Sequence, residues 1–542
     1  LSNTTGAVTA FGQKALFNNT TGADNTSVGL QSLVSNTTGN FNTALGHTAL
    51  QANTTASYNT AVGYQAAYNN TTGAKNSAFG YTTLHSNTTG QENAAFAKDA
   101  LQGNTTGSFN TAVGHQSLVS NTTASNNTAV GYQAGYTLNG GAELTAMGRQ
   151  AAYSLTTGSE NTALGSIALY STTTGSFNVA VGRQALQNNT TASNNTAVGY
   201  KAGYANTTGA NNNFFGYQAG QSNTTGGSNT AMGHNPFSFN TTGYGNCAFG
   251  IQTLYKNTTS NYNTAVGYNA LTENTTGTEN VSIGGFTLDA NVTGDYNTAV
   301  GTSALSASTG DANTAIGRHA LKSNTTASGN TAVGYVSLTS NTTGTNNVAL
   351  GSNSLQPNTT GSQNTALGKG ASASNSTGSN NTSVGFEALV SSTTASNNTA
   401  VGYQAGYSNT TGAALTAVGY VALTNNTTGN YNTAFGYEAG KGNTTAQLNT
   451  FIGFEAGRGT TTGAVNTIVG GRAMKTATTA NSNTGLGYGV MGLLTTGSKN
   501  VAVGRDAMAA NTTASNNVAV GYEAGYNTTT GIFNTFVGNV AG

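Results

Sequence analysis

The stretch NTTGSFNTAVGHQSLVS, residues 104–120, sets the architecture of this chain, because close copies of it follow one another along nearly the whole sequence. Its Asn-Thr-Thr opening, or a near relative, returns every 17 residues, and about 32 such repeats, counted from Asn3, fill the 542 residues. The consensus of the repeats is NTTGxxNTAVGYQALxx. Self-similarity at this period predicts a solenoid in which each repeat packs on the next.

We number the positions of each repeat 1 to 17 from the Asn of Asn-Thr-Thr. The repeat is too short for a helix pair, and its Asn, Thr, Gly and β-branched residues oppose helix formation. The Thr-Ala-Val segment favours a strand closed by Gly and Asn turns. We therefore predict an all-β fold, a parallel β-solenoid with one coil per repeat and like residues stacked about 4.8 Å apart. Residues 1–542 would then form one continuous domain, a rod roughly 150 Å long.

Comparison of the repeats also predicts the interior. Position 10 is always Val, Leu, Ile, Phe or Met, as at Val62, Phe79 and Met232, and we expect this column to line the core. Positions 9 and 14 are mostly Ala. Position 15 is often Leu, as at Leu33, Leu50, Leu84, Leu101, Leu169, Leu254 and Leu321. The predicted core is therefore narrow, with two columns of large apolar side chains and small residues between them.

Position 11 is Gly in every repeat except one, where Ala97 replaces it. A residue this constant within the chain indicates a positive φ angle or a close backbone approach. The representative structural turn residues are Gly63, Gly131, Gly199, Gly402 and Gly521.

The composition excludes several classes of function. Charged residues make up 6% of the chain, against about 25% in ordinary soluble domains. The 16 Lys and Arg residues form no cluster that would neutralise phosphates, so we expect no nucleic-acid partner. No apolar run approaches the roughly 18 residues of a membrane span, so we expect no membrane insertion in this segment. The chain starts at Leu1 without a secretory signal pattern, and we expect a processed chain or a segment of a longer fibre.

The residues with catalytic potential are scattered. His47, His115 and His234 share position 12 but lie at least four repeats apart, and the acidic residues form no recurring pair. Cys247 replaces Thr at position 8 and is expected to be a small buried residue. We therefore expect no enzyme activity, no cofactor and no metal site.

Tyrosine recurs at position 12 and provides the first candidate functional column. Stacked aromatic residues form either an exposed surface suited to glycans or a seam between chains. The candidate residues are Tyr64, Tyr132, Tyr200, Tyr268, Tyr335 and Tyr403.

The Asn of position 1 provides the second candidate column. Asn-Thr-Thr is an acceptor pattern for N-glycosylation, but the favoured interpretation is that stacked Asn side chains form a ladder that closes each turn. Full glycan occupancy at a spacing of about 4.8 Å would be crowded. The candidate residues are Asn19, Asn36, Asn53, Asn70, Asn87, Asn104 and Asn121.

The run from Gly107 to Gly114, GSFNTAVG, resembles the head repeat of YadA-like trimeric autotransporter adhesins and is similar to repeats of phage tail-fibre proteins. The spacing of seven between the two glycines and the Ala-Val-Gly core agree with the adhesin repeat. The repeat here is longer, and its Asn is displaced by one position. The resemblance implies a left-handed parallel β-roll, trimeric assembly and an extracellular location on a cell or virion surface.

These observations predict a non-enzymatic extracellular fibre segment that provides reach and attaches through repeated Tyr, Asn and Thr ladders. Expected partners are further copies of the chain, as a homo-oligomer with a trimer favoured or as an end-to-end filament, and surface glycans. Two alternatives are an ice-binding β-solenoid and a polysaccharide-processing β-helix.

Overall fold

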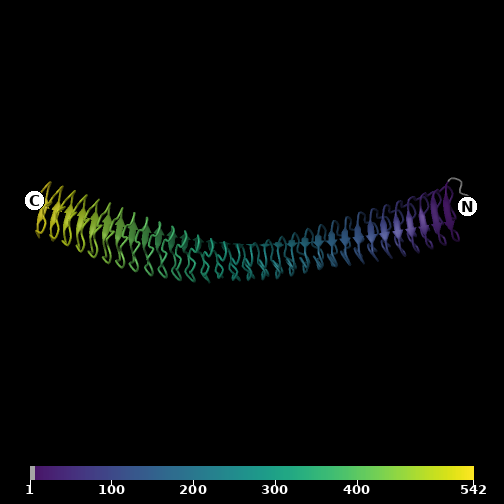
Figure 1. Ribbon diagram of the computed structural model, residues 1–542, viewed down its shortest axis with the longest axis horizontal. Coiled ribbons are helices and arrows are strands. Elements are labelled where there is room, and N and C mark those ends of the chain that lie inside the picture. The colour runs from purple at the N-terminus through teal and green to yellow at the C-terminus, as the bar shows by residue number, and fades with distance from the viewer. Residues whose placement is uncertain (1–5) are drawn as a thin grey trace. The chain divides into compact units, whose positions relative to one another are not determined.

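The structure is a computed structural model and describes residues 6–542. The predicted start of the first repeat, Asn3, lies outside the described residues. The chain forms two compact units, Leu1–Thr276 and Gly277–Gly542, which we call the N-terminal and C-terminal units. In each unit every coil contributes one short strand, and the strands lie side by side in a row (Figure 1).

The strands of the N-terminal unit are β1 (Val8–Phe11), β2 (Asn25–Val28), β3 (Thr43–Leu45), β4 (Thr60–Val62), β5 (Ser77–Phe79), β6 (Ala94–Phe96), β7 (Thr111–Val113), β8 (Thr128–Val130), β9 (Thr145–Met147), β10 (Thr162–Leu164), β11 (Val179–Val181), β12 (Thr196–Val198), β13 (Asn213–Phe215), β14 (Thr230–Met232), β15 (Cys247–Phe249) and β16 (Thr264–Val266).

The strands of the C-terminal unit are β17 (Val281–Ile283), β18 (Thr298–Val300), β19 (Thr314–Ile316), β20 (Thr331–Val333), β21 (Val348–Leu350), β22 (Thr365–Leu367), β23 (Thr382–Val384), β24 (Thr399–Val401), β25 (Thr416–Val418), β26 (Thr433–Phe435), β27 (Thr450–Ile452), β28 (Thr467–Val469), β29 (Thr484–Leu486), β30 (Val501–Val503), β31 (Val518–Val520) and β32 (Thr535–Val537).

Within each unit, each strand pairs in parallel with the next strand along the chain. Between β3 and β4, for example, Thr43 lies opposite Thr60, so equivalent repeat positions stack. Hydrogen bonds between coils continue beyond the strands. In the turn, for example, the backbone N–H of Ala67 donates to the carbonyl of Thr83 in the following coil. The predicted parallel β-solenoid with a 17-residue coil is therefore confirmed.

The strands show which columns face inward, and the prediction for position 10 is wrong. In β4, Ala61 is fully buried while Thr60 and Val62, on either side of it, are only half-buried. Side chains alternate between the two faces of a strand, so positions 8 and 10 share the outer face and position 9 alone points inward. Met232, Ile316 and the other residues of position 10 therefore lie on the surface of the solenoid.

The core is built from the Ala columns of positions 9 and 14 and from position 15, where the predicted Leu residues are fully buried. The available volume is small and shared between positions 9 and 15. Where position 9 is the buried Phe214, position 15 is Gly in the same coil, Gly220, and in the preceding coil, Gly203. A methyl group built on Gly203 would come within 2.8 Å of the Phe214 ring. Phe451 at position 9 of another coil shows the same arrangement. Position 15 is Gly457 in its own coil and Gly440 in the preceding coil.

The coil turns through left-handed residues that are not glycine. Positions 6, 13 and 15 have positive φ, as shown by Tyr58 (63°), Gln65 (54°) and Ala67 (50°). Such residues cost about 1 kcal/mol each. The backbone hydrogen bonds between coils offset this cost, since Tyr58 and Gln65 also donate their N–H groups to carbonyls of the preceding coil. The stacking of coils therefore stabilises these turns.

Candidate functional site

The tyrosines of position 12 lie exposed beside the outer face of the strands. Tyr132, Tyr268, Tyr335 and Tyr403 are 43–52% exposed, Tyr64 is slightly less exposed, and Tyr200 is half-buried. Several of them stack on the ring of an adjacent coil. The measured centroid distances are 5.0 Å for Tyr64 and Tyr81, 5.6 Å for His115 and Tyr132, and 5.4 Å for Tyr200 and Tyr217.

The longest run of stacked rings crosses five coils of the C-terminal unit. Phe386, Tyr403, Tyr420, Tyr437 and Phe454 follow one another at centroid distances of 5.5, 5.2, 5.2 and 5.3 Å, with interplanar angles of 7–16°. The ring faces are thus turned toward one another, and the column presents ring edges and hydroxyl groups to solvent. A ligand that contacts this column therefore meets a row of polar edges rather than open aromatic faces.

The asparagines of position 1 are buried and form a ladder. The Nδ2 of Asn36 donates to the Oδ1 of Asn19 in the preceding coil (2.8 Å). It also donates to the backbone carbonyl of Gly39 in the same coil (3.0 Å). Equivalent bonds between neighbouring side chains, of 2.7–3.0 Å, join Asn53, Asn70, Asn87, Asn104 and Asn121 to the ladder. The Nδ2 that a glycan would modify therefore lies inside the folded coil with hydrogen-bond acceptors, and this geometry favours the ladder over glycosylation.

A second buried ladder, at position 7, was missed by the sequence reasoning. The backbone N–H of Asn59 donates to the Oδ1 of Asn42 in the preceding coil (3.0 Å), and the Nδ2 of Asn42 donates to the carbonyl of Ala56 in the following coil (2.9 Å). Near-constant Asn at position 7 of the repeats was the signal that could have identified it. The two ladders satisfy most of the polar groups inside a coil that is too thin for a purely apolar core. The exceptions at position 7 are the Nδ2 groups of Asn59, Asn127, Asn195 and Asn398, which are buried without a hydrogen-bond partner.

The glycines of position 11 occupy a backbone conformation that other residues rarely adopt. Gly63, Gly131, Gly199, Gly402 and Gly521 have φ angles of 134–139°. A Cβ atom at Gly63 would also overlap the carbonyl oxygen of Gly80 in the following coil. These residues are structural, and each follows directly after the last residue of a strand.

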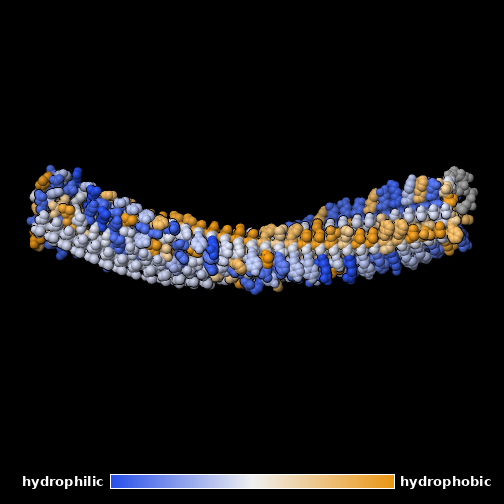
Figure 2. Space-filling view, viewed as in Figure 1, coloured by the Kyte–Doolittle hydropathy of each residue, from blue (hydrophilic) through white to orange (hydrophobic). Residues whose placement is uncertain are grey.

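The outer column of position 10 is a surface feature that the sequence reasoning placed inside the protein. Leu45, Met147, Phe435 and Leu486 are 46–57% exposed, and the other members are at least partly exposed. Figure 2 shows a continuous hydrophobic band along the coils of the N-terminal unit. Exposed large apolar side chains in such a row are typical of a surface that contacts another molecule.

Among residues 6–542, no three His, Cys, Asp or Glu side chains lie close enough together to hold a metal ion. His85 stacks on Tyr68 at 5.2 Å, and burial lowers the pKa of its imidazole. Cys247 is partly exposed on the outer face of β15, so the prediction of a buried cysteine is wrong, and desolvation raises the pKa of its thiol. In the same range, no helix has the length and apolar character needed to cross a bilayer.

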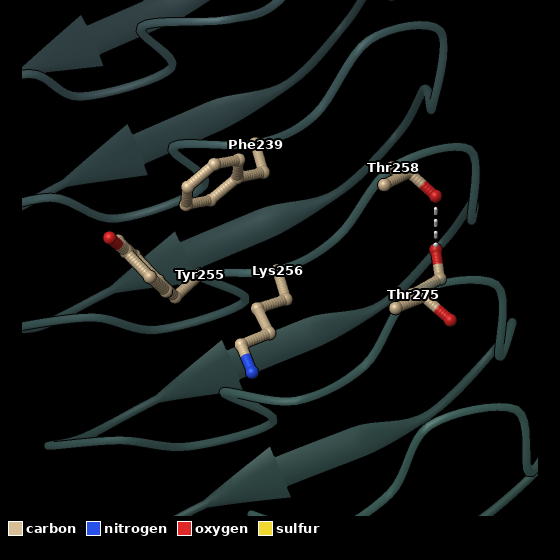
Figure 3. Close-up of a pocket in the computed structure, with 5 residues that line it drawn as sticks. All are labelled: Phe239, Tyr255, Lys256, Thr258 and Thr275. Carbon is tan, nitrogen blue, oxygen red and sulfur yellow. Dashed lines mark hydrogen bonds between the residues drawn. The ribbon is translucent and has the colours of Figure 1, made fainter.

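A shallow hollow of about 310 Å³ lies at a corner of the N-terminal unit (Figure 3). Phe239 and Tyr255 form one side with their rings edge to face at 5.0 Å, and Lys256 lies beside them. Thr258 and Thr275 form the other side, where the Thr258 hydroxyl donates to the Thr275 carbonyl at 3.1 Å. Its lining is largely apolar, and Lys256 is paired with Glu273 at 2.6 Å.

No protein-family model matches this sequence. A comparison with curated proteins also yields no match.

Proposed function

We propose that this chain is a structural and adhesive segment of an extracellular fibre, which extends from a cell or virion surface and assembles by lateral association of identical solenoids. The observation that carries this proposal is the exposed apolar column of position 10, with the aromatic column of position 12 beside it. Both columns repeat once per coil.

The column provides enough area for a stable contact. If each coil buries roughly 50 Å² of position 10 and its flanks, the 16 strands of one unit bury about 800 Å² on each partner, which is the size of a standard interface. A thin core of Ala and Leu provides little apolar burial per residue. Association through the outer column would add the burial that the single coil lacks.

The regular spacing of the column favours a second copy of the same chain as the occupant. An apolar row with one side chain every coil, about 4.8 Å apart, is matched along its length only by a surface with the same period. The resemblance to trimeric adhesin heads favours three chains around a common axis. The column of position 12 would then lie at the margin of the seam, and its Tyr hydroxyl groups would remain available for surface glycans.

Adhesion in this proposal depends on repetition. A single Tyr edge with neighbouring amide groups binds weakly, but a rigid row of such groups engages a repetitive surface many times at once. The solenoid holds the groups at fixed spacing, so the entropic cost of ordering them is met during folding.

The experiment is a comparison of oligomeric state by sedimentation velocity. The native chain is expected to sediment as a trimer, and the triple variant Val113→Lys, Val130→Lys and Met147→Lys is expected to dissociate. A matched control places lysine at the exposed position 3 of three coils, with Thr106→Lys, Thr123→Lys and Thr157→Lys. A native chain that is monomeric at every accessible concentration would contradict lateral association.

A second candidate function is favoured by one observation. The outer face of the strands presents Thr at position 8 beside the apolar residue of position 10, as in Thr60 and Val62, in a regular two-column array. Such an array is also suited to ordering water at an ice surface. Thermal hysteresis of the native protein, abolished by replacing the outer Thr residues of several coils with Lys, would support ice binding over the fibre.

A further inference from the structure

Charged residues are sparse in this chain, but three neighbouring coils of the C-terminal unit contain an unusual concentration of them. Glu438, Glu455 and Arg472 follow one another at position 13, and Lys441, Arg458 and Lys475 follow one another at position 16 of the same coils. In most other coils position 13 is Gln or another neutral residue. The two columns run side by side, so these six side chains form one network.

Glu455 is the centre of this network. Its side chain is only 9% exposed, and its carboxylate contacts Arg458 (2.7 Å), Lys475 (2.9 Å) and Arg472 (3.4 Å). Glu438 pairs with Lys441 (3.0 Å) and Arg458 (2.7 Å). The hydrogen bond from Lys475 and the charges of the three cations hold the pKa of Glu455 below its ordinary value, against the opposing effect of desolvation.

The network has more positive than negative charge. Two carboxylates face four cations, which leaves a surplus of two positive charges. Glu455 fixes the positions of Arg472 and Lys475, yet their side chains are still 53% and 34% exposed. A buried carboxylate therefore holds two cationic groups at the surface in a defined arrangement.

A notch opens directly beside Arg472 and Lys475. The next coil has Gly489 at position 13 and Gly492 at position 16, so both side-chain columns are interrupted at the same level. The resulting hollow of about 330 Å³ has Arg472 and Lys475 on one side and Asp506 and Tyr526 of later coils on the other. A volume near 300 Å³ is at the lower end of small-ligand sites.

The backbone shows that the two glycines create space and are not needed for the turn. Gly489 has a φ of 64°, close to the 54° of Gln65 at the same position of another coil. A side chain at Gly489 is therefore compatible with the fold, but its Cβ would meet the Oδ1 of Asp506 and fill the notch. Replacement by the consensus Gln would restore the column and remove the hollow.

We infer that this notch binds one acidic sugar residue, a saccharide unit bearing a carboxylate. The carboxylate of the sugar would pair with Arg472 and Lys475, and its hydroxyl groups would donate to Asp506 across the notch. Asp506 already accepts from the Nε of Arg505 at its Oδ2 (3.2 Å), and its Oδ1 lies beside Gly489. A simple anion would satisfy only the cationic side, whereas a sugar acid also provides a donor for this Oδ1. This inference rests on the proposed adhesive function and assigns it a site and a ligand class.

The test uses the full chain and saturation-transfer difference NMR with sodium glucuronate as the probe and glucose as the neutral counterpart. Glucuronate signals are expected to be attenuated on saturation of the protein, with millimolar affinity, and glucose signals are not. Arg472→Gln, which introduces the residue most common at position 13, is expected to weaken glucuronate binding about tenfold. Equal signals for the two sugars, or glucuronate binding unchanged in Arg472→Gln, would overturn the inference.

A filling variant separates the notch from general electrostatic attraction. Gly489→Gln keeps every charge and is expected to abolish glucuronate binding, whereas Gly370→Gln, at position 13 of a coil without this network, is expected to leave it intact. Binding that survives Gly489→Gln would also overturn the inference. Sedimentation of the same variants distinguishes the two proposals, because lateral association does not require the notch and is expected to persist in both.

Discussion

The inner and outer faces of each strand differ in what limits their side chains. On the inner face Ala at position 9 is often combined with Leu at position 15, whereas the large Phe214 is combined with Gly at position 15. One residue further along, the outer face accepts Val, Leu, Ile, Phe or Met without any matching change elsewhere. The interior is limited by volume and the exterior is not, so apolar character by itself does not report burial in this solenoid.

The largest expected effect comes from overfilling the inner face. Ala112, in β7, is equivalent to Phe214, and the glycines that contact Phe214 correspond here to Leu101 and Leu118, both fully buried. Ala112→Phe is expected to lower the free energy of unfolding by about 3 kcal/mol, because the ring has no space beside the two leucines. Urea denaturation and amide hydrogen exchange of the surrounding coils would measure the loss.

The matched rescue copies the arrangement at Phe214. Combining Ala112→Phe with Leu101→Gly and Leu118→Gly is expected to recover part of the lost stability, despite the cost of two added glycines. If the triple variant is less stable than Ala112→Phe alone, the proposed sharing of volume between positions 9 and 15 is wrong.

The next largest loss of stability is expected from removing the buried charge of Glu455, compared with removing the exposed charge of Glu92. Glu455→Gln leaves three cations facing one another without their common carboxylate, and is expected to cost about 2 kcal/mol, a value reduced because the cations are partly exposed. Glu92→Gln is the control, since Glu92 and its partner Lys75 are 40% and 62% exposed. Its loss is expected to be below about 0.5 kcal/mol. Equal losses in the two variants would contradict the buried network.

The contribution of Glu455 is also expected to depend on pH. Its pKa is lower in the folded chain than the ordinary value of 4.5, so the stabilisation is complete above that value and is lost as the pH falls through the folded pKa. The difference in stability between native protein and Glu455→Gln should therefore shrink in acid. Denaturation series at neutral pH and below pH 4.5 would measure this, and a difference that grows in acid would contradict it.

A smaller, stabilising effect is expected from completing the inner Asn ladder. Ser392 interrupts position 1, and both its hydroxyl and the Oδ1 of Asn375 are buried without a hydrogen-bond partner. Ser392→Asn would donate to Asn375 and accept from Asn409 of the following coil. We expect a gain of about 1 kcal/mol, measured as a higher denaturation midpoint. Ser392→Ala, which leaves Asn375 unpaired, is the control, and an equal gain in that variant would show that the ladder is not the cause.

The smallest effect is expected on the outer face. Val113→Phe adds a ring one residue away from Ala112, but Val113 is 38% exposed and Phe79 and Phe96 occupy the same column. The stability of the isolated chain is expected to change by less than about 0.5 kcal/mol. A loss comparable to that of Ala112→Phe would mean that position 10 is confined after all, and would remove the contrast between the two faces.

Most of the fold could be predicted from the sequence, because the 17-residue period shows which residues stack, and β-branched residues between Gly and Asn turns indicate short strands. Position 11 was recognised from its constancy, and its φ angles lie in the region expected of glycine. The candidate columns at positions 1 and 12 were found in the same way. The Asn ladder expected at position 1 is also what the structure shows. Exposure could not be predicted, because a repeating sequence identifies a column without showing whether it faces in or out.

The sequence by itself thus determined the coil length, the parallel stacking and the membership of each column, since these follow from local propensity and from exact spacing along the chain. Only the tertiary structure decided which columns are buried. The coil is narrow, and the space between its two walls fits an Ala side chain facing a Leu side chain. Under this volume limit the larger side chain of position 10 faces outward, and the polar Asn side chains of positions 1 and 7 face inward. The notch beside Arg472 likewise exists only because side chains 17 residues apart become neighbours when the coils stack.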